Sequence, residues 1–357
     1  MVTREQYLQN IKNHVVRHFQ NHQESIWHKL PISRRSSVFI LLFLGQLGEL
    51  RVILTKRSSK LRNFPGHISL PGGKADDGLE SEWHVARREM EEEIGLSSNN
   101  DELEQKYGFT IDHLNILPSY LSRTFSAVRP CIGYMNFSKK VDESDLIHNL
   151  KINLNPGESS SIFSCPLRDF LYPVVEEEPL ESLDRNSYAV KWGGIPWNLR
   201  SYTFLQTNSN EASWLKGIKD LSASEDEDDQ GTDIDNSEKE SVTPPEARKK
   251  TKKDLSEWGR LGSRRHSETN EKIYDVWGLT ANILHDLADV TYRGPPKREL
   301  GEEELIYSIW KYGNQMRAKE RSEAEVKLIQ SKAMDDFGFG EILPRTEFNR
   351  LKKLYKL

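Results

Sequence analysis

The sequence predicts an α+β fold in which a mixed β-sheet is packed between helices. Two aliphatic runs at 37–44 and 50–56 have the composition of paired strands, and a charged helical stretch follows them at 80–94. Further strand-like segments then precede an amphipathic stretch at 273–290. Strands, one central helix, more strands and a closing helix are typical of an α/β/α sandwich.

The N-terminal region, residues 1–32, is expected to hold an amphipathic helix. It lacks the apolar core of a signal peptide. Apolar side chains recur on one helical stripe, formed by Leu8, Ile11, Val15 and Phe19. We therefore predict a helix through this stretch.

The first strands and the central helix have clear boundaries. Residues 37–44 and 50–56 are rich in aliphatic and β-branched side chains, and a glycine-bounded turn lies between them, which predicts a hairpin. Residues 80–94 are helical by composition, and Gly95 is a suitable residue to end the helix in the left-handed conformation.

The remaining elements follow from the same patterns. We expect strands in 118–137, a strand leading into a short helix in 159–171, and two aromatic-rich strands around Gly193-Gly194 in 188–207. Residues 273–290 and 302–330 are predicted to be helical.

Residues 222–270 differ in kind from the rest of the chain. An acidic block precedes a basic block, and aliphatic residues are almost absent. Such a segment buries too little apolar surface to offset the entropy of ordering, so we predict a disordered insertion within a domain spanning 33–317. A helical tail, 318–357, follows. The basic block suits nuclear import or RNA binding, but we favour neutralisation by the acidic block; a protein partner of the insertion stays unknown.

Composition limits the classes of function. The chain has 357 residues, a net charge of -5 and two cysteines. A nearly balanced charge does not favour nucleic acid as a partner, and two cysteines favour a reducing intracellular compartment over a disulfide scaffold. We expect no membrane span, because no apolar run approaches the roughly 20 residues that one requires.

The stretch 72–96, "GGKADDGLESEWHVARREMEEEIGL", holds the strongest chemical signal. On a helix, Glu89, Glu92 and Glu93 stand at i, i+3 and i+4 and project from one face. Converging carboxylates suit Mg²⁺ or Mn²⁺, which prefer oxygen ligands and often bind substrate phosphates as well. The alternative is a solvated glutamate-rich helix with incidental ion pairs.

Neighbouring residues support a metal-assisted phosphate site. Arg88 precedes Glu89 and is placed to pair with Glu92. Gly72 and Gly73 allow a loop backbone to approach a substrate closely.

A basic stretch immediately precedes these glycines. It contains Lys56, Arg57, Lys60 and Arg62. Cations beside an acidic metal site suit a substrate with several phosphates, whereas the alternative is an exposed basic loop.

The spacing of this region resembles the Nudix box. Glu80 is followed by seven residues and then by "REMEEEIGL", which agrees with the box at every specified position. Six residues separate Gly73 from Glu80 where the box has five, which leaves the path of that loop in question. The resemblance implies the Nudix α/β/α sandwich, with a mixed β-sheet and a central catalytic helix.

A second resemblance concerns the substrate. The stretch "LTKRSSKLRNFPGHISLPGG" is similar to the signature of Nudix coenzyme A diphosphatases, with Arg57, Ser58, Arg62 and Gly66 in register and Leu70 where Phe is usual. Similarity to fungal peroxisomal members extends from about residue 35 to 317. In this comparison Arg123 is a candidate phosphate or adenine contact.

The resemblance implies metal-dependent hydrolysis of the diphosphate of coenzyme A (CoA) or acyl-CoA to 3′,5′-ADP and (acyl-)4′-phosphopantetheine. Glu89, Glu92 and Glu93 would hold Mg²⁺ or Mn²⁺, Arg88 would orient them, and Glu89 is the first choice for the base. Arg57, Ser58, Arg62, Gly66, Gly72, Gly73 and Arg123 would bind substrate.

Compartment and function have alternatives. The resemblance and the terminal Tyr-Lys-Leu, which is similar to the peroxisomal tripeptide, indicate the peroxisome, with mitochondrion and cytosol as alternatives. The alternative functions are a house-cleaning nucleotide diphosphatase that acts on oxidised dGTP or NADH, and a non-catalytic Nudix-fold binding module that uses the insertion.

Overall fold

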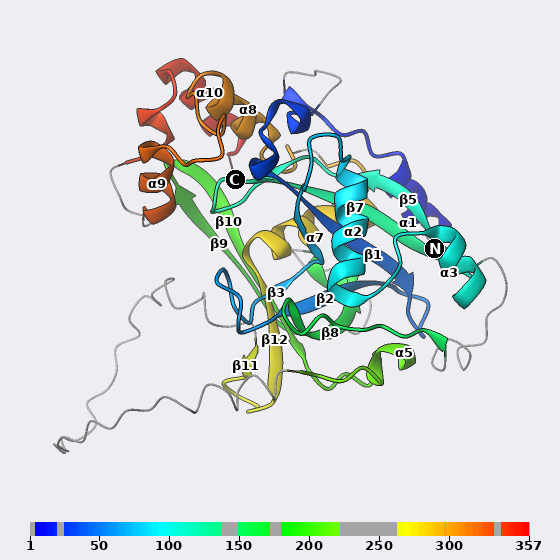
Figure 1. The fold of residues 1–357 in the computed structure, drawn as a ribbon. Coiled ribbons are helices and arrows are strands. Elements are labelled where there is room, and N and C mark those ends of the chain that lie inside the picture. Colours follow the sequence, from blue (N-terminus) through cyan, green and yellow to red (C-terminus); the bar gives the residue numbers. More distant parts are fainter. Residues whose placement is uncertain are drawn as a thin grey trace, which may run out of the picture.

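The computed structural model describes residues 4–19, 25–137, 149–171, 180–221, 263–296, 298–331 and 337–356. The described residues form two β-sheets with helices packed on them (Figure 1). Most of the predicted insertion and the terminal Leu357 lie outside the described residues.

The larger sheet has eight strands and the order β3-β2-β1-β7-β5, with β4 paired to β1, β6 to β7 and β8 to β2. Only the β1–β7 pair is parallel among these described strands, so the sheet is mixed, as predicted. The strands are β1 (Arg35–Leu44), β2 (Leu50–Arg57), β3 (Ile68–Ser69), β4 (Gly72–Lys74), β5 (Phe109–Ile116), β6 (Tyr120–Leu121), β7 (Ala127–Phe137) and β8 (Ser159–Pro166).

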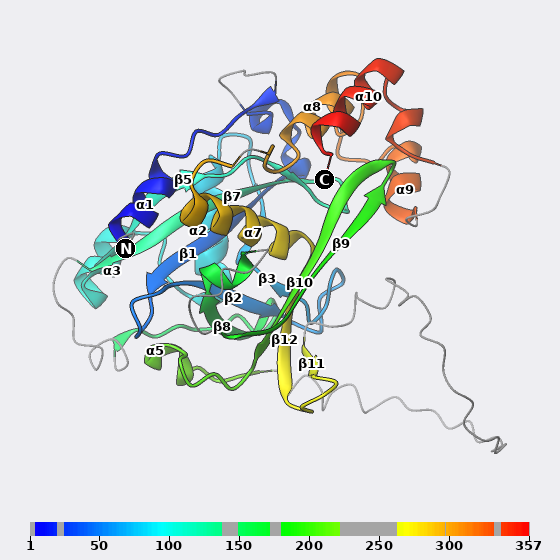
Figure 2. The same ribbon diagram turned by 180° about the vertical axis from the view of Figure 1, so that it is seen from behind.

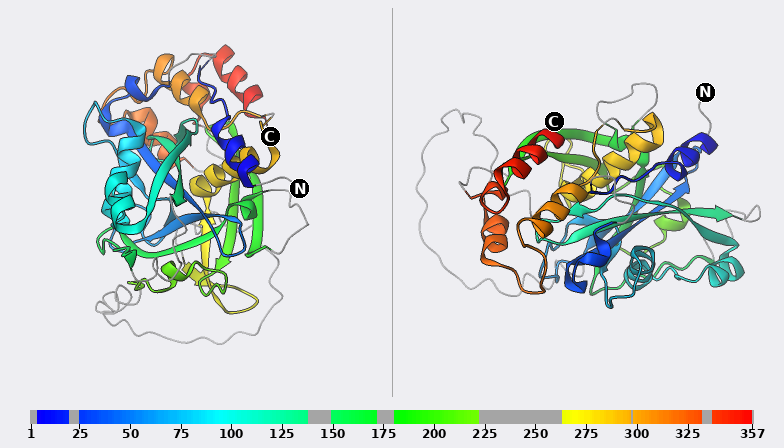
Figure 3. Two further views of the ribbon diagram at one scale, coloured as in Figure 1. Left: turned by 90° about the vertical axis from the view of Figure 1, so that its right-hand side faces the viewer. Right: turned by 90° about the horizontal axis from the view of Figure 1, so that it is seen from above.

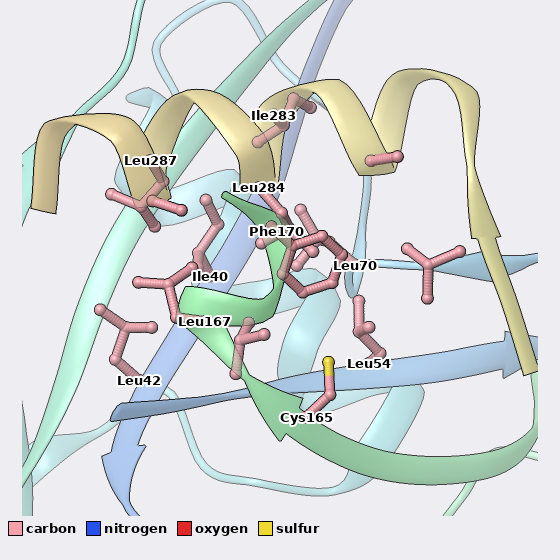
Figure 4. Close-up of a cluster of buried hydrophobic side chains, with 14 of the residues drawn as sticks. Ile40, Leu42, Leu54, Leu70, Cys165, Leu167, Phe170, Ile283, Leu284 and Leu287 are labelled. Carbon is pink, nitrogen blue, oxygen red and sulfur yellow. The ribbon is translucent and has the colours of Figure 1, made fainter. Parts of the chain in front are cut away.

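Helices cover both faces of this sheet (Figure 3). Helices α2 (Glu82–Ile94) and α3 (Asn100–Tyr107) pack on one face, and α1 (Arg4–Lys12) and α7 (Gly278–Arg293) pack on the other. Strand β1 alternates between the two cores, because successive side chains of a strand point to opposite faces: Phe39 and Leu41 face α2, whereas Ile40 and Leu42 face α7 (Figure 4). The predicted sandwich is confirmed.

The smaller sheet has the order β11-β12-β10-β9. Its strands are β9 (Ser182–Trp192), β10 (Ile195–Leu205), β11 (Ser263–Arg265) and β12 (Lys272–Trp277). The β9–β10 hairpin turns at Gly193-Gly194, as predicted, and reaches the C-terminal helices (Figure 2). Strand β11 lies within the stretch that was predicted to be disordered, so that prediction is wrong at this end. The segment is ordered because it pairs with β12, a contact that composition does not reveal.

The helix expected at 273–290 begins later than predicted. Residues 272–277 form β12, which pairs with β10, and α7 starts only at Gly278. Gly278 has a φ of +63°, a backbone conformation that glycine adopts readily, and it marks the junction between strand and helix.

The C-terminal helices close around the end of the β9–β10 hairpin. They are α8 (Glu303–Lys311), α9 (Glu323–Gln330) and α10 (Arg345–Leu354), so the predicted helical stretch 302–330 is divided into two helices. Leu305 of α8, Leu328 of α9 and Leu351 of α10 share one buried cluster with Trp192. Short helices complete the fold: α5 (Ser213–Lys216), η2 (Trp27–Lys29), η3 (Ile32–Arg34), η4 (Leu167–Phe170) and η7 (Phe339–Glu341).

The N-terminal helix is shorter than expected. Helix α1 ends at Lys12, and Val15, predicted on its apolar stripe, is 80% exposed. Ile11 is buried under α7, and Phe19 stacks on Tyr307 from outside the helix. Within the described residues, no helix is long and apolar enough to span a bilayer.

Candidate active site

Helix α2 presents its acidic side chains to one face because its other face is buried. The Ser81 side chain accepts a hydrogen bond from the His84 N–H (3.2 Å) and begins the helix, and Gly95 ends it with a φ of +72°. These are the caps expected at the two ends of a helix. The stripe of Ala86, Met90 and Ile94 is fully buried in the core, and Glu89, Glu92 and Glu93 lie on a separate face of the helix, where Glu93 is also buried.

Glu93 is the most deeply buried of the three predicted metal ligands. Its Oε1 accepts a hydrogen bond from the Gly72 N–H (3.2 Å), and its Oε2 accepts one from the Ser159 hydroxyl (3.3 Å). Burial raises its pKa to about 7, with the charges of Glu89 and Glu158 acting in the same direction. Gly72 thus contacts the acidic face, while its predicted approach to the substrate stays a prediction, and no sequence pattern indicated Ser159.

Glu89 lies against the other predicted glycine. A Cβ on Gly73 would stand 2.3 Å from the Glu89 carboxylate, so only glycine leaves room for it. Burial raises the pKa of Glu89 to about 7, and the charges of Glu92 and Glu158 contribute to the rise against the opposing effect of Arg88. A carboxyl with a pKa near neutrality is suited to general base catalysis.

Arg88 links the acids across the helix face. Its guanidinium donates to Glu80 (Nε, 3.1 Å), to Glu89 (Nη1, 3.0 Å) and to Glu92 (Nη1, 3.2 Å). It also donates to the Lys74 carbonyl at 2.9 Å. The pairing of Arg88 with Glu92 was predicted, whereas the role of Glu80 in holding Arg88 was missed.

Glu158 joins the site from a distant part of the sequence. It lies in the turn that begins at Pro156-Gly157, just before β8. Its charge raises the pKa of both Glu89 and Glu93. Among the described residues its Oε2 is buried without a hydrogen-bond partner. The sequence alone did not assign a role to Glu158, and the structure places it beside the acids.

The basic stretch forms a loop, residues 58–67, that is tied to this acidic face. The Ser58 N–H donates to the Glu158 carbonyl at 2.8 Å, and the Gly66 N–H donates to the Arg57 carbonyl at 3.2 Å. The positive charge of Arg57 acts to lower the pKa of Glu93. The side chain of Arg62 is exposed. Arg57 therefore acts on the acidic face, an arrangement that suits a polyphosphate substrate.

Arg123 is the one predicted substrate residue whose described contacts lie elsewhere. Its guanidinium stands 5.3 Å from the centre of the Trp192 ring and donates to the Ser331 carbonyl. Both partners belong to the region of the C-terminal helices. These contacts give Arg123 a packing environment, and its predicted contact with phosphate or adenine stays a prediction.

The donor set fits a divalent cation. Glu89, Glu92, Glu93 and Glu158 supply carboxylate oxygens, the ligands that hard cations prefer. A cation would relieve the repulsion that raises the pKa of Glu89 and Glu93. Among the described residues, no three His, Cys, Asp or Glu side chains are already grouped as a metal site, and Arg88 pairs with both Glu89 and Glu92.

Comparison with known proteins agrees with this geometry. Residues 33–182, which contain all eight strands of the larger sheet up to the start of β9, match the family model described as the NUDIX domain. The chain is 37% identical over 347 residues to peroxisomal coenzyme A diphosphatase 1 of Saccharomyces cerevisiae, covering 92% of this chain and 90% of that protein.

Two further relatives match shorter portions. The mitochondrial Nudix hydrolase 15 of Arabidopsis thaliana is 28% identical over 74% of this chain and 60% of its own length. A peroxisomal coenzyme A diphosphatase of Mus musculus is 32% identical over 40% of this chain and 51% of its own length. Three findings agree: the family match, the yeast relative that is covered over nine-tenths of its length, and the geometry of the site. The chain therefore belongs to the Nudix hydrolase family as a homologue of peroxisomal coenzyme A diphosphatases.

Proposed function

We propose that the protein hydrolyses the diphosphate of CoA and CoA derivatives. Water adds across the bond, and the products are 3′,5′-ADP and 4′-phosphopantetheine, which is acylated when the substrate is an acyl-CoA. The observation that carries the proposal is the Ser58 N–H to Glu158 carbonyl bond, because it ties the CoA-signature loop to the turn whose Glu158 charge acts on Glu89 and Glu93 of the Nudix box. The resemblance to coenzyme A diphosphatases supports the same substrate.

The acidic residues divide into two roles. Glu89, Glu92 and Glu93 would hold the divalent cation that Nudix hydrolases generally need, and oxygen ligands of this kind favour Mg²⁺ or Mn²⁺. When bound, such an ion polarises a phosphate and lowers the pKa of a water molecule. Glu89 is our first choice for the group that takes the proton of the attacking water, because its carboxylate is largely buried against the β4 backbone at Gly73 and is oriented by Arg88.

The remaining residues position the reacting groups. Arg88 holds Glu89 and Glu92 at 3.0 and 3.2 Å and keeps the two carboxylates oriented before the cation binds. Gly72 and Gly73 keep the β4 backbone close to the acids. We expect Arg57 and Arg62 to pair with substrate phosphates.

Ser58 and Gly66 hold the loop that carries these cations. The Ser58 side chain is buried and its oxygen accepts a hydrogen bond from the Lys60 N–H (3.3 Å). Gly66 has a φ of +70°, which favours glycine because other residues clash there. Both residues therefore fix the path of the loop in which Arg57 and Arg62 stand.

A hydrolysis assay tests the function. The purified protein would be given CoA, acetyl-CoA, oxidised dGTP and NADH with Mg²⁺ or Mn²⁺. Release of 3′,5′-ADP from CoA supports the proposal, whereas turnover of the nucleotides alone would move the chain to the nucleotide diphosphatases. No turnover by folded, metal-loaded protein would favour a binding module.

A matched pair of variants separates chemistry from folding. Glu92→Gln removes one carboxylate charge from the acidic face and should abolish most of the turnover with little change in the melting temperature. Glu91→Gln, one residue away, is the control: Glu91 is exposed, and its carboxylate accepts from the Ser98 N–H at 2.9 Å. Full activity of folded Glu92→Gln would contradict the assignment.

We also propose the peroxisome as the compartment. The support is the names of the relatives in yeast and mouse, while one plant relative is named mitochondrial. Fluorescence microscopy of the tagged full chain, with the tag at the N-terminus, distinguishes the two organelles and the cytosol.

A further inference from the structure

An aromatic side chain in the basic loop is held in an unfavourable conformation. Phe64 has a φ of +52°, which is uncommon for residues other than glycine because the Cβ crowds the backbone. Its side chain is 46% exposed. Neither the backbone conformation nor the exposure serves the stability of the fold.

Phe125 shows how such a conformation is normally stabilised. It has a similar φ of +58°, but its side chain is fully buried and packs against Trp192 and Phe339. Burial of an aromatic ring offsets the strain there. Phe64 has much less burial to offset its strain, and strained residues of this kind cluster at ligand-binding sites.

The Phe64 ring belongs to a short aromatic row. Its centre lies 5.3 Å from the His67 ring, and the His67 ring lies 5.4 Å from that of Trp277. Trp277 is the last residue of β12 in the smaller sheet, which runs beside β3 (Figure 1). Two distant segments of the chain therefore meet at the row, with Phe64 as its exposed end.

The aromatic row is connected to the acidic face through Arg57. The Arg57 guanidinium donates to the carbonyl of Asn63, the residue before Phe64, at 3.4 Å. The Arg57 N–H also donates to the His67 carbonyl at 2.9 Å. The same arginine acts electrostatically on Glu93, so one residue spans the distance between the acids and the aromatic rings.

We propose that Phe64 is a specificity-determining residue that stacks on the adenine ring of the substrate, with His67 and Trp277 supporting it. A planar base stacks on an aromatic face, and the neighbouring Arg57 is placed to pair with phosphate on the same half of CoA. The inference rests on the proposed function. It predicts that the adenine half of CoA, and not the pantetheine half, depends on the Phe64 ring.

Binding of the two half-products tests this assignment. Calorimetry would measure the Kd of 3′,5′-ADP and of 4′-phosphopantetheine for wild type, Phe64→Gly and Phe64→Trp. Loss of one stacking contact weakens base binding by about tenfold or more. We expect Phe64→Gly to weaken 3′,5′-ADP by that factor and leave 4′-phosphopantetheine unchanged, and Phe64→Trp to retain the affinity.

Measurements of stability and kinetics distinguish substrate binding by Phe64 from a merely structural role. Glycine relaxes the positive φ, so Phe64→Gly should melt no lower than wild type while its KM for CoA rises and its kcat stays nearly constant. Phe137→Leu is the control, because Phe137, at the end of β7, is also a partly exposed ring (37%) that packs on another ring. The KM of this variant for CoA should equal that of wild type.

Two kinds of failure are distinguishable. A wild-type protein that hydrolyses no CoA would contradict the proposed function itself. A wild-type protein that hydrolyses CoA, together with a Phe64→Gly variant of unchanged KM or one that loses affinity for 4′-phosphopantetheine instead, would overturn the adenine assignment alone.

Discussion

Replacing Gly73 by alanine should remove activity without unfolding the protein. The new Cβ would lie 2.3 Å from the Glu89 carboxylate, whereas ordinary contact begins near 3.4 Å. The carboxylate therefore has to move by about 1 Å. The fold tolerates this because the obstructing atoms are the end of a flexible side chain and Gly73 does not have a positive φ.

The expected loss of activity follows from that displacement. A misplacement of 1 Å in a catalytic group reduces the rate by about 100-fold. The kcat for CoA hydrolysis at saturating metal measures the effect, and thermal unfolding monitors the fold. A Gly73→Ala variant with wild-type kcat would refute the view that the position of the Glu89 carboxylate matters.

The adjacent glycine provides the control. A Cβ on Gly72 would lie 2.4 Å from the Ser37 carbonyl oxygen and 2.6 Å from the Val38 Cα. Backbone atoms of a central strand cannot move aside, so Gly72→Ala should destabilise the fold by about 1–3 kcal/mol. If Gly73→Ala lowered the melting temperature as much as Gly72→Ala, its loss of activity would report folding and the reasoning would fail.

Three further results are expected. The pKa of Glu89 and of Glu93 is raised from 4.5 to about 7, so the stability of the metal-free protein falls as the pH rises from 4.5 to about 7. Thermal scans should therefore show that Mg²⁺ raises the melting temperature more at pH 8 than at pH 6. Glu158→Gln removes a charge that raises both pKa values, so the acidic limb of the pH–kcat/KM profile should move to lower pH; a shift upwards would contradict this. Glu303 is buried, yet hydrogen bonds and Arg129 lower its pKa to about 2, so its stabilisation is lost as pH falls from 4.5 to 2, and Glu303→Gln should cost about 3 kcal/mol in urea unfolding at pH 7.

The parts of the site that the sequence predicted are local. Glu89, Glu92 and Glu93 share a face because helical geometry fixes the direction of side chains three and four positions apart. Arg88 reaches Glu92 for the same reason. Gly95 ends the helix in the expected left-handed conformation, since no tertiary contact is needed for this cap.

The parts that the sequence missed depend on strand pairing. Glu158 and Ser159 reach the acids because β8 pairs with β2, where Arg57 is aligned with Ser159. No spacing in the sequence shows which strand becomes the neighbour of another. The strand–helix boundary at Gly278 was missed for a related reason, because the apolar side chains of 273–276 suit either element until β10 is paired with them.

The segment beyond the family match is part of the same folded unit as the site. Arg34 is buried, pairs with Glu325 of α9 at 2.7 Å and donates to the carbonyls of Phe125 and Ala318. Removing α9 would leave that guanidinium buried without its carboxylate, a loss that costs about 3–5 kcal/mol. Trp277 closes the aromatic row behind the basic loop. The Nudix glutamates and the hydrogen bonds that hold the basic loop are contained in residues 33–182, and the rest of the chain adds Trp277 behind that loop and Glu325 beside Arg34.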